Sequence, residues 1–267
     1  MAALSLATER MIAEIDGAIG WMIFNNPERR NAVSLDMWQA IPDILDHFES
    51  DPAVRVIVLR GAGDKAFVAG LDISQFADRF SSPEANAEFS AVTTRANDRI
   101  LNAAKPTVAM IRGFCVGGGV QIATNCDLRI ASENARLALT PAKLGLAYPV
   151  RALKRIVDLI GPACAKEMFF TARQFSAAEA HAMGLVNRVV ADAELEKEVR
   201  AVCATIAENA PLTIKAVKAI VAELVKPSPE TDMTRCEALV KACFSSADLE
   251  EGRRAFLEKR RPAFAGR

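Results

Sequence analysis

The sequence predicts an α/β fold built of stacked strand–strand–helix turns. Three segments are typical of buried strands because nearly all their residues are apolar or β-branched: 54–61, 106–113 and 128–132. A glycine-bearing loop and a helical segment follow each of the first two, so the same order of elements recurs along the chain. The length of 267 residues suits one large domain, or a domain with an appendage.

The N-terminal elements are expected to be a hairpin and a helix. Residues 11–24 alternate in polarity around Asp16-Gly17, which is typical of a β-hairpin. Residues 34–50 carry apolar side chains at helical spacing, with Ser34 as the expected N-cap. Pro42 lies inside this segment, so we expect a kink there or a different helix boundary.

The C-terminal part is expected to be helical. Helices are predicted within residues 151–183, followed by a strand at 185–190, and from residue 192 onward the pattern is helical only. One helix begins near Pro211, at an early position where a missing N–H costs little. We therefore divide the chain into a core with the site (1–200) and a helical region for packing and oligomerisation (201–267).

Composition excludes several classes of function. The 33 basic residues equal the 33 acidic ones, which gives no reason to expect a nucleic acid or a membrane as partner. No apolar run approaches the roughly 20 residues that span a bilayer, and the N-terminus does not resemble a signal peptide. Six scattered cysteines without a CxxC pair predict buried free thiols in a cytoplasmic protein. With only His47 and His181 present, we expect no metal site.

Two loops share one pattern, in which a strand is followed by a turn of small residues and then by a helix start. One contains Gly70, and the other contains Gly117, Gly118 and Gly119. Backbone N–H groups in such loops can bind a phosphate or the oxyanion that develops on a carbonyl. The phosphate motifs GxxxxGK[ST] and GxGxxG at the first βα turn are absent, whereas two loops could direct one N–H each at a single oxygen. The alternative is that each glycine cluster serves only as a tight turn.

Five segments together resemble the enoyl-CoA hydratase/isomerase (crotonase) superfamily. They are KAFVAGLDISQF (65–76), RGFCVGGGVQIATNCDLRIAS (112–132), LGLAYP (144–149), GLVNRVV (184–190) and SADLEEGRRAFLEKRRPAFAG (246–266). The resemblance runs from about residue 11 to the C-terminus. It implies a spiral core of ββα units, a C-terminal region used in trimerisation, and acyl-CoA thioesters as substrates. Coenzyme A would then be part of the substrate rather than a tightly bound cofactor, and the protein a homotrimer or a dimer of trimers.

The resemblance also implies roles for individual residues. The N–H groups of Leu71 and Gly118 match the two donors that stabilise a thioester enolate or a tetrahedral oxyanion in this family. Arg29, Lys65 and Lys259 match positions that lie near coenzyme A, the last reaching across from a neighbouring subunit. Further expected substrate contacts are Ala66, Val68, Gly70, Gly117 and Pro141.

Two residues depart from the hydratases of this family, which hold a water between two glutamates. The first glutamate follows the glycine triplet by two positions, where this chain has Gln121, and alignment without gaps puts Pro141 at the second. A glutamine cannot accept a proton at neutral pH. Positioned acid–base groups contribute roughly 10²–10⁴-fold in rate, so we expect ordinary hydration to be very slow.

Tyr148, the only tyrosine, is a further candidate catalytic residue. Its segment TPAKLGLAYPV resembles methylmalonyl-CoA decarboxylases, in which the matching tyrosine lies in the active site. Decarboxylation needs no added base, because the departing CO₂ leaves an enolate for the oxyanion hole to stabilise. Those enzymes carry a histidine where this chain has Leu71 and an acidic residue at the position of Gln121. Alternatively, Tyr148 is an amphipathic core residue.

The sequence therefore predicts an acyl-CoA-processing enzyme of the hydratase/isomerase family that works without paired glutamates. The alternatives are an acyl-CoA decarboxylase or thioester hydrolase that uses Tyr148, and a CoA-thioester-binding protein with little catalysis. A Clp-like serine protease would share the spiral core, but neither histidine adjoins a serine-bearing turn. Asp72 is expected to cap the helix after the first loop.

Overall fold

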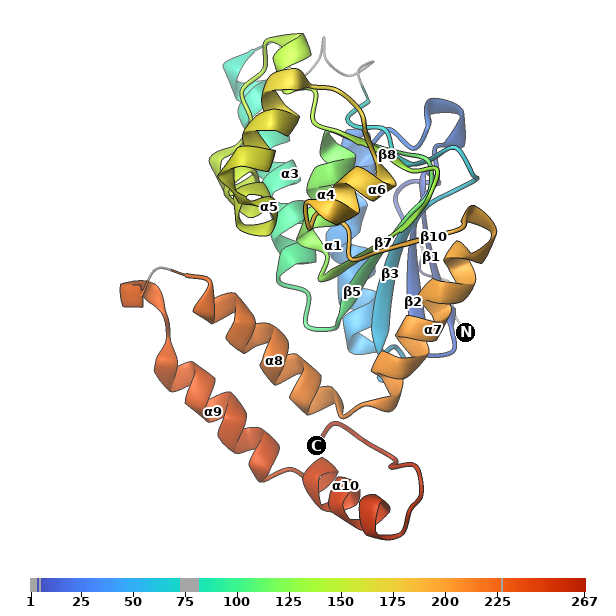
Figure 1. The fold of residues 1–267 in the computed structure, drawn as a ribbon, viewed down its shortest axis with the longest axis vertical. Helices are drawn as coiled ribbons and strands as arrows, with labels where there is room; N and C mark the ends of the chain where they lie inside the picture. The colour runs from blue at the N-terminus through green and yellow to red at the C-terminus, as the bar shows by residue number, and fades with distance from the viewer. Residues whose placement is uncertain (1–3, 5, 73–81, 227) are drawn as a thin grey trace.

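Two β-sheets form the centre of the molecule (Figure 1). A computed structural model describes residues 4, 6–72, 82–226 and 228–267. The larger sheet has the order β1 (Met11–Asp16), β2 (Ile19–Phe24), β3 (Val56–Gly61), β5 (Thr107–Ile111), β7 (Leu128–Ser132), β10 (Arg188–Val190). The smaller has the order β4 (Ala66–Val68), β6 (Phe114–Val116), β8 (Arg136–Ala138), β9 (Phe175–Ser176). Neighbouring strands are parallel except in the pairs β1–β2 and β8–β9.

The repeated strand–strand–helix order predicted from the sequence is present. β3 and β4 precede α3 (Pro83–Leu101), β5 and β6 precede α4 (Gly118–Asn125), and β7 and β8 precede α5 (Val150–Thr171). Each turn contributes one strand to each sheet, so the loop from the second strand to the helix recurs at the same side of the molecule. The hairpin expected at residues 11–24 is confirmed as β1 and β2, paired antiparallel.

The inner strands of the larger sheet are buried on both faces. Along β3, Val56 and Val58 pack toward α7 (Leu195–Glu208), whereas Ile57 and Leu59 belong to the cluster that includes α1 (Leu35–Ser50) and α3. The helix boundary that Pro42 suggested is wrong, because α1 continues through this residue. Its apolar face is fully buried, and this packing outweighs the missing backbone hydrogen bond.

The remaining helices lie at the C-terminal side. After the short α6 (Ala177–Ala182) and α7, the helices α8 (Pro211–Leu224), α9 (Met233–Phe244) and α10 (Ala247–Leu257) extend below the α/β body in Figure 1. Lys218 of α8 anchors this region, because its Nζ donates to Asp127 Oδ2 (2.8 Å) and to the Lys105 carbonyl (3.0 Å). The proposed division at residue 200 stays a prediction.

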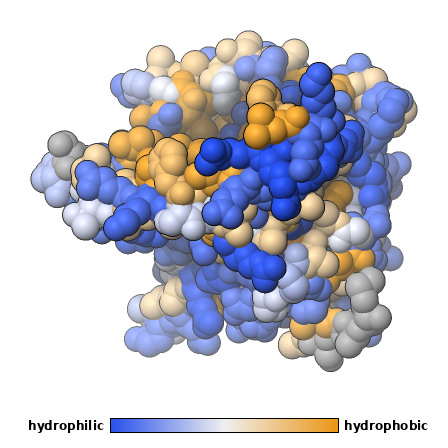
Figure 2. Space-filling model, turned by 90° about the horizontal axis from the view of Figure 1, so that it is seen from below, coloured by the Kyte–Doolittle hydropathy of each residue, from blue (hydrophilic) through white to orange (hydrophobic). Residues whose placement is uncertain are grey.

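Apolar side chains remain exposed on the C-terminal helices. Figure 2, which views the molecule from the end where these helices lie, shows apolar residues gathered beside a strongly hydrophilic surface. The exposed apolar residues of α8 and α9 and the turn between them include Val217, Val221, Leu224, Val225, Met233, Val240 and Phe244. None of the helices within the described ranges has the length and apolar character that crossing a membrane requires. All six cysteines are free, and Cys115, Cys126, Cys203 and Cys236 are buried.

Candidate active site

One cavity of about 870 Å³ is lined by both glycine loops. Its other walls come mainly from α1, α3, α4, α5 and the segment that leads into α5. The candidate residues that line it are Gly70, Leu71, Gly117, Gly118, Gln121, Pro141 and Tyr148. The structure thus brings together loops that lie more than forty residues apart in the chain.

The two loops lie against one another. A Cβ atom built on Gly118 would lie 3.8 Å from the carbonyl carbon of Gly70, which is bonded to the Leu71 nitrogen. The same Cβ would lie 3.7 Å from Leu71 Cδ2. A Cβ on Gly70 would lie 3.4 Å from the carbonyl oxygen of Val116, the residue before the triplet. The amides of residues 71 and 118 are therefore close neighbours at the cavity wall.

Backbone hydrogen bonds on both sides of Leu71 fix the first loop. Val33 N–H donates to the Gly70 carbonyl (2.9 Å), and Asp72 N–H donates to the Val33 carbonyl (3.1 Å). Successive amides of an extended segment point to opposite sides, so the Leu71 N–H faces away from Val33. It donates to none of the residues that the structure describes.

The structural reason for a glycine differs among the three adjacent positions. Gly117 has φ 53° and ψ −109°, a conformation that residues with a Cβ rarely adopt. A Cβ on Gly119 would lie only 2.1 Å from the Val68 carbonyl oxygen, so close packing of α4 on β4 requires glycine there. Gly118 has no positive φ, and the nearest atom to its Cβ position is an ordinary 3.7 Å away. Neither backbone conformation nor packing explains the glycine at 118.

Gly118 is also the first residue of α4. Its N–H has no acceptor within the helix, and the aligned peptide dipoles give this end partial positive charge. No hydrogen bond from it to the rest of the described chain is present. An oxygen carrying negative charge would be stabilised at this position.

Carboxylates are scarce at the cavity wall. The Gln121 side chain makes no hydrogen bond with the described residues, and Pro141 begins the short helix η3 (Pro141–Leu144). Among the described lining residues, the carboxylates are Asp98 and Asp158. Each forms an ion pair, with Arg151 (3.4 Å) and Lys154 (2.6 Å) respectively. No pair of unpaired carboxylates therefore faces the cavity in this part of the chain.

Tyr148 presents its ring rather than its hydroxyl to the cavity. The ring packs edge-on against Phe169, with centroids 4.9 Å apart, and the hydroxyl is buried without a hydrogen-bond partner. Burial, and secondarily the nearby Cys115 thiol, raise the pKa of the Tyr148 phenol far above its usual range. The group is thus protonated at neutral pH and can only act as a donor of its proton or as a neutral acceptor.

The expected coenzyme A contacts lie outside the cavity wall. Arg29 Nη1 donates to both carboxylate oxygens of Asp72 (2.9 and 3.1 Å), whose side chain is only 5% exposed. The prediction that Asp72 caps a helix concerns residues that lie outside the described ranges. Lys65 and Lys259 are exposed, and the side chains of Ala66 and Val68 are buried in β4. The coenzyme A roles of these residues stay predictions.

The lining residues that were not singled out from the sequence include Trp38, Asn97, Asn125 and Arg155. Trp38 fits the apolar spacing of α1, and its buried Nε1 has no hydrogen-bond partner. Asn125 follows Gln121 by four residues, a spacing that puts both on one helix face and was visible in the sequence. Asn97 and Arg155 come from α3 and α5, and no local pattern marks them.

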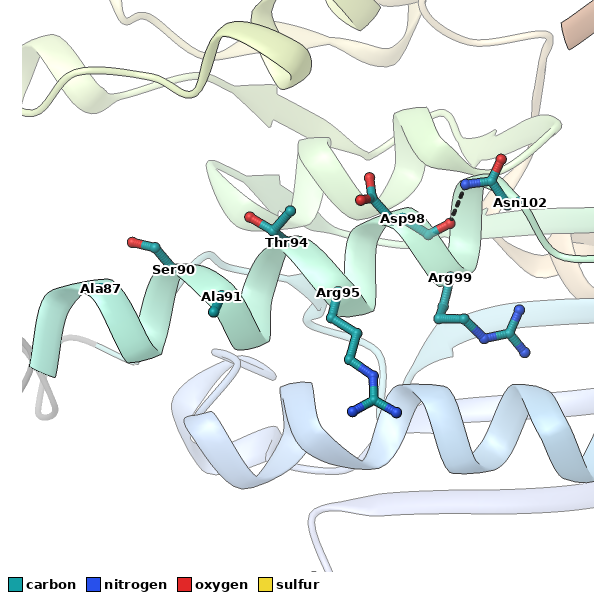
Figure 3. A pocket seen from close by; sticks show the side chains of 8 residues that line it. All are labelled: Ala87, Ser90, Ala91, Thr94, Arg95, Asp98, Arg99 and Asn102. Atoms are coloured by element: carbon teal, nitrogen blue, oxygen red, sulfur yellow. Dashed lines mark hydrogen bonds between the residues drawn. The ribbon is translucent and has the colours of Figure 1, made fainter. Parts of the chain in front are cut away.

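A second hollow, of about 790 Å³, lies along α3 (Figure 3). Ser90, Thr94 and Asp98 extend to one side of the helix, whereas Arg95 and Arg99 extend toward α1. Arg99 pairs with Asp46 and Glu49 of α1, which makes it part of the contact between the two helices. The residues that line this hollow all belong to α3 or, for Asn102, to its C-cap, so the cavity between the glycine loops is the better candidate site.

Comparison with known proteins agrees with this geometry. The model of the enoyl-CoA hydratase/isomerase family matches residues 14–267. The chain belongs to this family. It is 35% identical to the crotonyl-CoA hydratase of Syntrophomonas wolfei, over 97% of the chain and 99% of that protein. It is 33% identical to the peroxisomal Δ(3,5)-Δ(2,4)-dienoyl-CoA isomerase of Arabidopsis thaliana, over 94% of both.

Solved structures show the same fold for this family member. An enoyl-CoA hydratase/carnithine racemase from Magnetospirillum magneticum superposes with a TM-score of 0.91 at 33% identity. The match covers 98% of the chain and 97% of that structure. The crotonase-like fold expected from the resemblance is thereby confirmed, as is the assignment to an enzyme family of the lyase and isomerase classes.

Proposed function

We propose that this family member stabilises negative charge on an acyl-CoA thioester oxygen with the N–H groups of Leu71 and Gly118. One observation carries the proposal: the two amides lie in contacting loops at one cavity, and neither donates to another described residue. The glycine at 118, which neither conformation nor packing requires, keeps the approach to these amides open. One such donor typically contributes about 3–4 kcal/mol in the transition state.

The reaction is an enolate-forming one that does not depend on paired glutamates. Hydration needs a base for the water and an acid for the adjacent carbon. Gln121 can orient a water or a substrate oxygen but supplies neither, and Pro141 has no proton to exchange. The relatives named as hydratases therefore indicate the ligand class more directly than the reaction.

Decarboxylation is a second candidate, favoured by the state of Tyr148. Its phenol carries its proton at neutral pH and has no hydrogen-bond partner among the described residues, so a rotation that turned the hydroxyl toward the cavity would let it protonate an enolate carbon after CO₂ departs. The carboxylate carbon–carbon bond breaks, its electron pair moves into the enolate, and the phenol proton then goes to carbon. Solvent restores the proton to the tyrosine.

A substrate panel tests these proposals. Crotonyl-CoA hydration, methylmalonyl-CoA decarboxylation and release of free CoA would be measured beside binding isotherms for the same thioesters. We expect binding of acyl-CoA, slow hydration and a faster reaction of another kind. Rapid crotonyl-CoA hydration would overturn the proposed loss of acid–base catalysis. Tight binding without any product would favour a CoA-thioester-binding protein, and no binding at all would overturn the proposal.

Coenzyme A binding and assembly belong to the same proposal. Lys65 and Lys259 are exposed cations suited to coenzyme A phosphates, and Arg29 adjoins the same loop although it pairs with Asp72. The exposed apolar side chains of α8 and α9 support a homotrimer or a dimer of trimers. Sedimentation equilibrium would test this, and a monomer at micromolar concentration would contradict it.

A further inference from the structure

The cavity continues beyond Gln121 along one face of α4. Gly118, Gln121 and Asn125 are spaced at i, i+3 and i+7, and all three line it. With a rise of 1.5 Å per residue, Asn125 lies about 6 Å further along the helix than Gln121 and about 10 Å beyond Gly118. An acyl group whose thioester oxygen is held at Gly118 could therefore extend its other end toward Asn125.

This far end contains a buried pair of side-chain amides. Asn97 and Asn125 are only 6% and 7% exposed. Asn125 Nδ2 donates to Asn97 Oδ1 (2.8 Å), and Asn97 Nδ2 donates to the Thr93 carbonyl (2.8 Å). Each amide nitrogen has two N–H donors, so one on each residue remains available. Burying such donors against an aliphatic tail would be unfavourable, because nothing on the tail could accept a hydrogen bond.

Arg155 brings a positive charge to the same end. Its Nε donates to the carbonyl of Thr124 (3.0 Å), the residue before Asn125, and its side chain lines the cavity. The two terminal nitrogens of its guanidinium make no hydrogen bond or ion pair with the described residues. By contrast, the other cations at the described cavity wall, Arg151 and Lys154, are each paired with an aspartate.

A purely structural role for Arg155 would need only the Nε group of its side chain. A cation near the last carbonyls of a helix is stabilising, and the Nε contact with Thr124 fulfils that role. It leaves the two-pronged end of the guanidinium, which matches the geometry of a carboxylate, directed at nothing within the described chain. This end belongs to a residue that lines the same cavity as the two asparagines with their spare amide donors.

We propose that Arg155, Asn97 and Asn125 form a subsite for a carboxylate at the far end of the acyl group. The substrate class is then the CoA monothioester of a dicarboxylic acid, with its thioester oxygen at Leu71 and Gly118 and its free carboxylate at Arg155. This inference rests on the proposed function of the glycine loops, since it takes the position of the thioester from them.

Paired ligands test the subsite. Glutaryl-CoA and pentanoyl-CoA share the coenzyme and the length of the acyl chain, and they differ in whether the chain ends in a carboxylate or a methyl group. Calorimetry on the full-length protein should show glutaryl-CoA bound about tenfold more tightly or better. In Arg155→Gln this preference should disappear, with pentanoyl-CoA affinity changed by less than about twofold.

Two further variants separate charge from folding. Lys154→Gln removes a neighbouring cation that is already paired with Asp158, and it should keep the preference for glutaryl-CoA. If Arg155→Gln does not fold, Arg155→Lys keeps the charge but loses the fork, and it should retain only part of the preference. Equal affinity of the wild type for the two ligands would overturn the subsite and leave the glycine-loop proposal standing. Failure to bind either ligand would instead overturn the proposed function.

Discussion

Replacing Gly118 with proline would remove one amide donor while changing the fold little. Gly118 is the first residue of α4, where proline is well tolerated because that N–H has no acceptor in the helix. The Cβ of proline has space, since the nearest atom to this position is 3.7 Å away, and the ring Cδ would take the place of the amide hydrogen. Gly117 has no Cβ, which relieves much of the clash that a residue before proline suffers.

The expected loss of enolate stabilisation follows from the free energy that one N–H donor contributes. Removing one such N–H costs about 3–4 kcal/mol, which corresponds to two to three pKa units of a bound acid at about 1.36 kcal/mol each. Acetoacetyl-CoA provides the readout, because it ionises at carbon and its enolate absorbs in the ultraviolet. The wild type should lower the apparent pKa of the bound ligand, and Gly118→Pro should raise it again by about two to three units.

Gly118→Ala is the matched control for this variant. It adds a Cβ at the same position but retains the N–H, so it should keep most of the pKa lowering. Thermal unfolding of both variants would verify that α4 remains intact. If folded Gly118→Pro ionised acetoacetyl-CoA as readily as Gly118→Ala, the amide at 118 would not be a donor and the reasoning would fail.

Three other substitutions separate packing from chemistry. Gly119→Ala should destabilise the fold by about 1–3 kcal/mol in a denaturant titration, because its Cβ would meet the Val68 carbonyl at 2.1 Å; an unchanged midpoint would contradict the packing argument. Gln121→Glu combined with Pro141→Glu should raise crotonyl-CoA hydration by about 10²-fold or more, and no gain would mean that the alignment of that loop is wrong. Tyr148→Phe should slow methylmalonyl-CoA turnover by about 10²-fold with no loss of thermal stability, since the hydroxyl has no partner to lose; near wild-type turnover would make the ring structural.

The sequence predicts those parts of the site that lie in continuous segments. Both glycine loops, Gln121 and Tyr148 stand in local patterns of strand, turn and helix, and the structure brings them to one cavity. The longer strands were predictable for the same reason, because four or five buried residues in a row leave a clear signal. The three-residue strands of the smaller sheet, such as β4, are too short for any periodicity to show.

The far end of the cavity could not be predicted in this way. Asn97 and Arg155 lie more than fifty residues apart in two different helices, and each fits the ordinary polar pattern of its helix. Only the packing of α3 and α5 around α4 shows that their polar atoms share one space. The same holds for the different roles of the three glycines, which depend on the atoms that surround each one.

A crystal structure with bound acetoacetyl-CoA would test the role of the two amides most directly. We expect the thioester oxygen to lie about 2.7–3.1 Å from both the Leu71 and the Gly118 nitrogen. A thioester oxygen bound elsewhere in the cavity, or within reach of only one of these nitrogens, would contradict it.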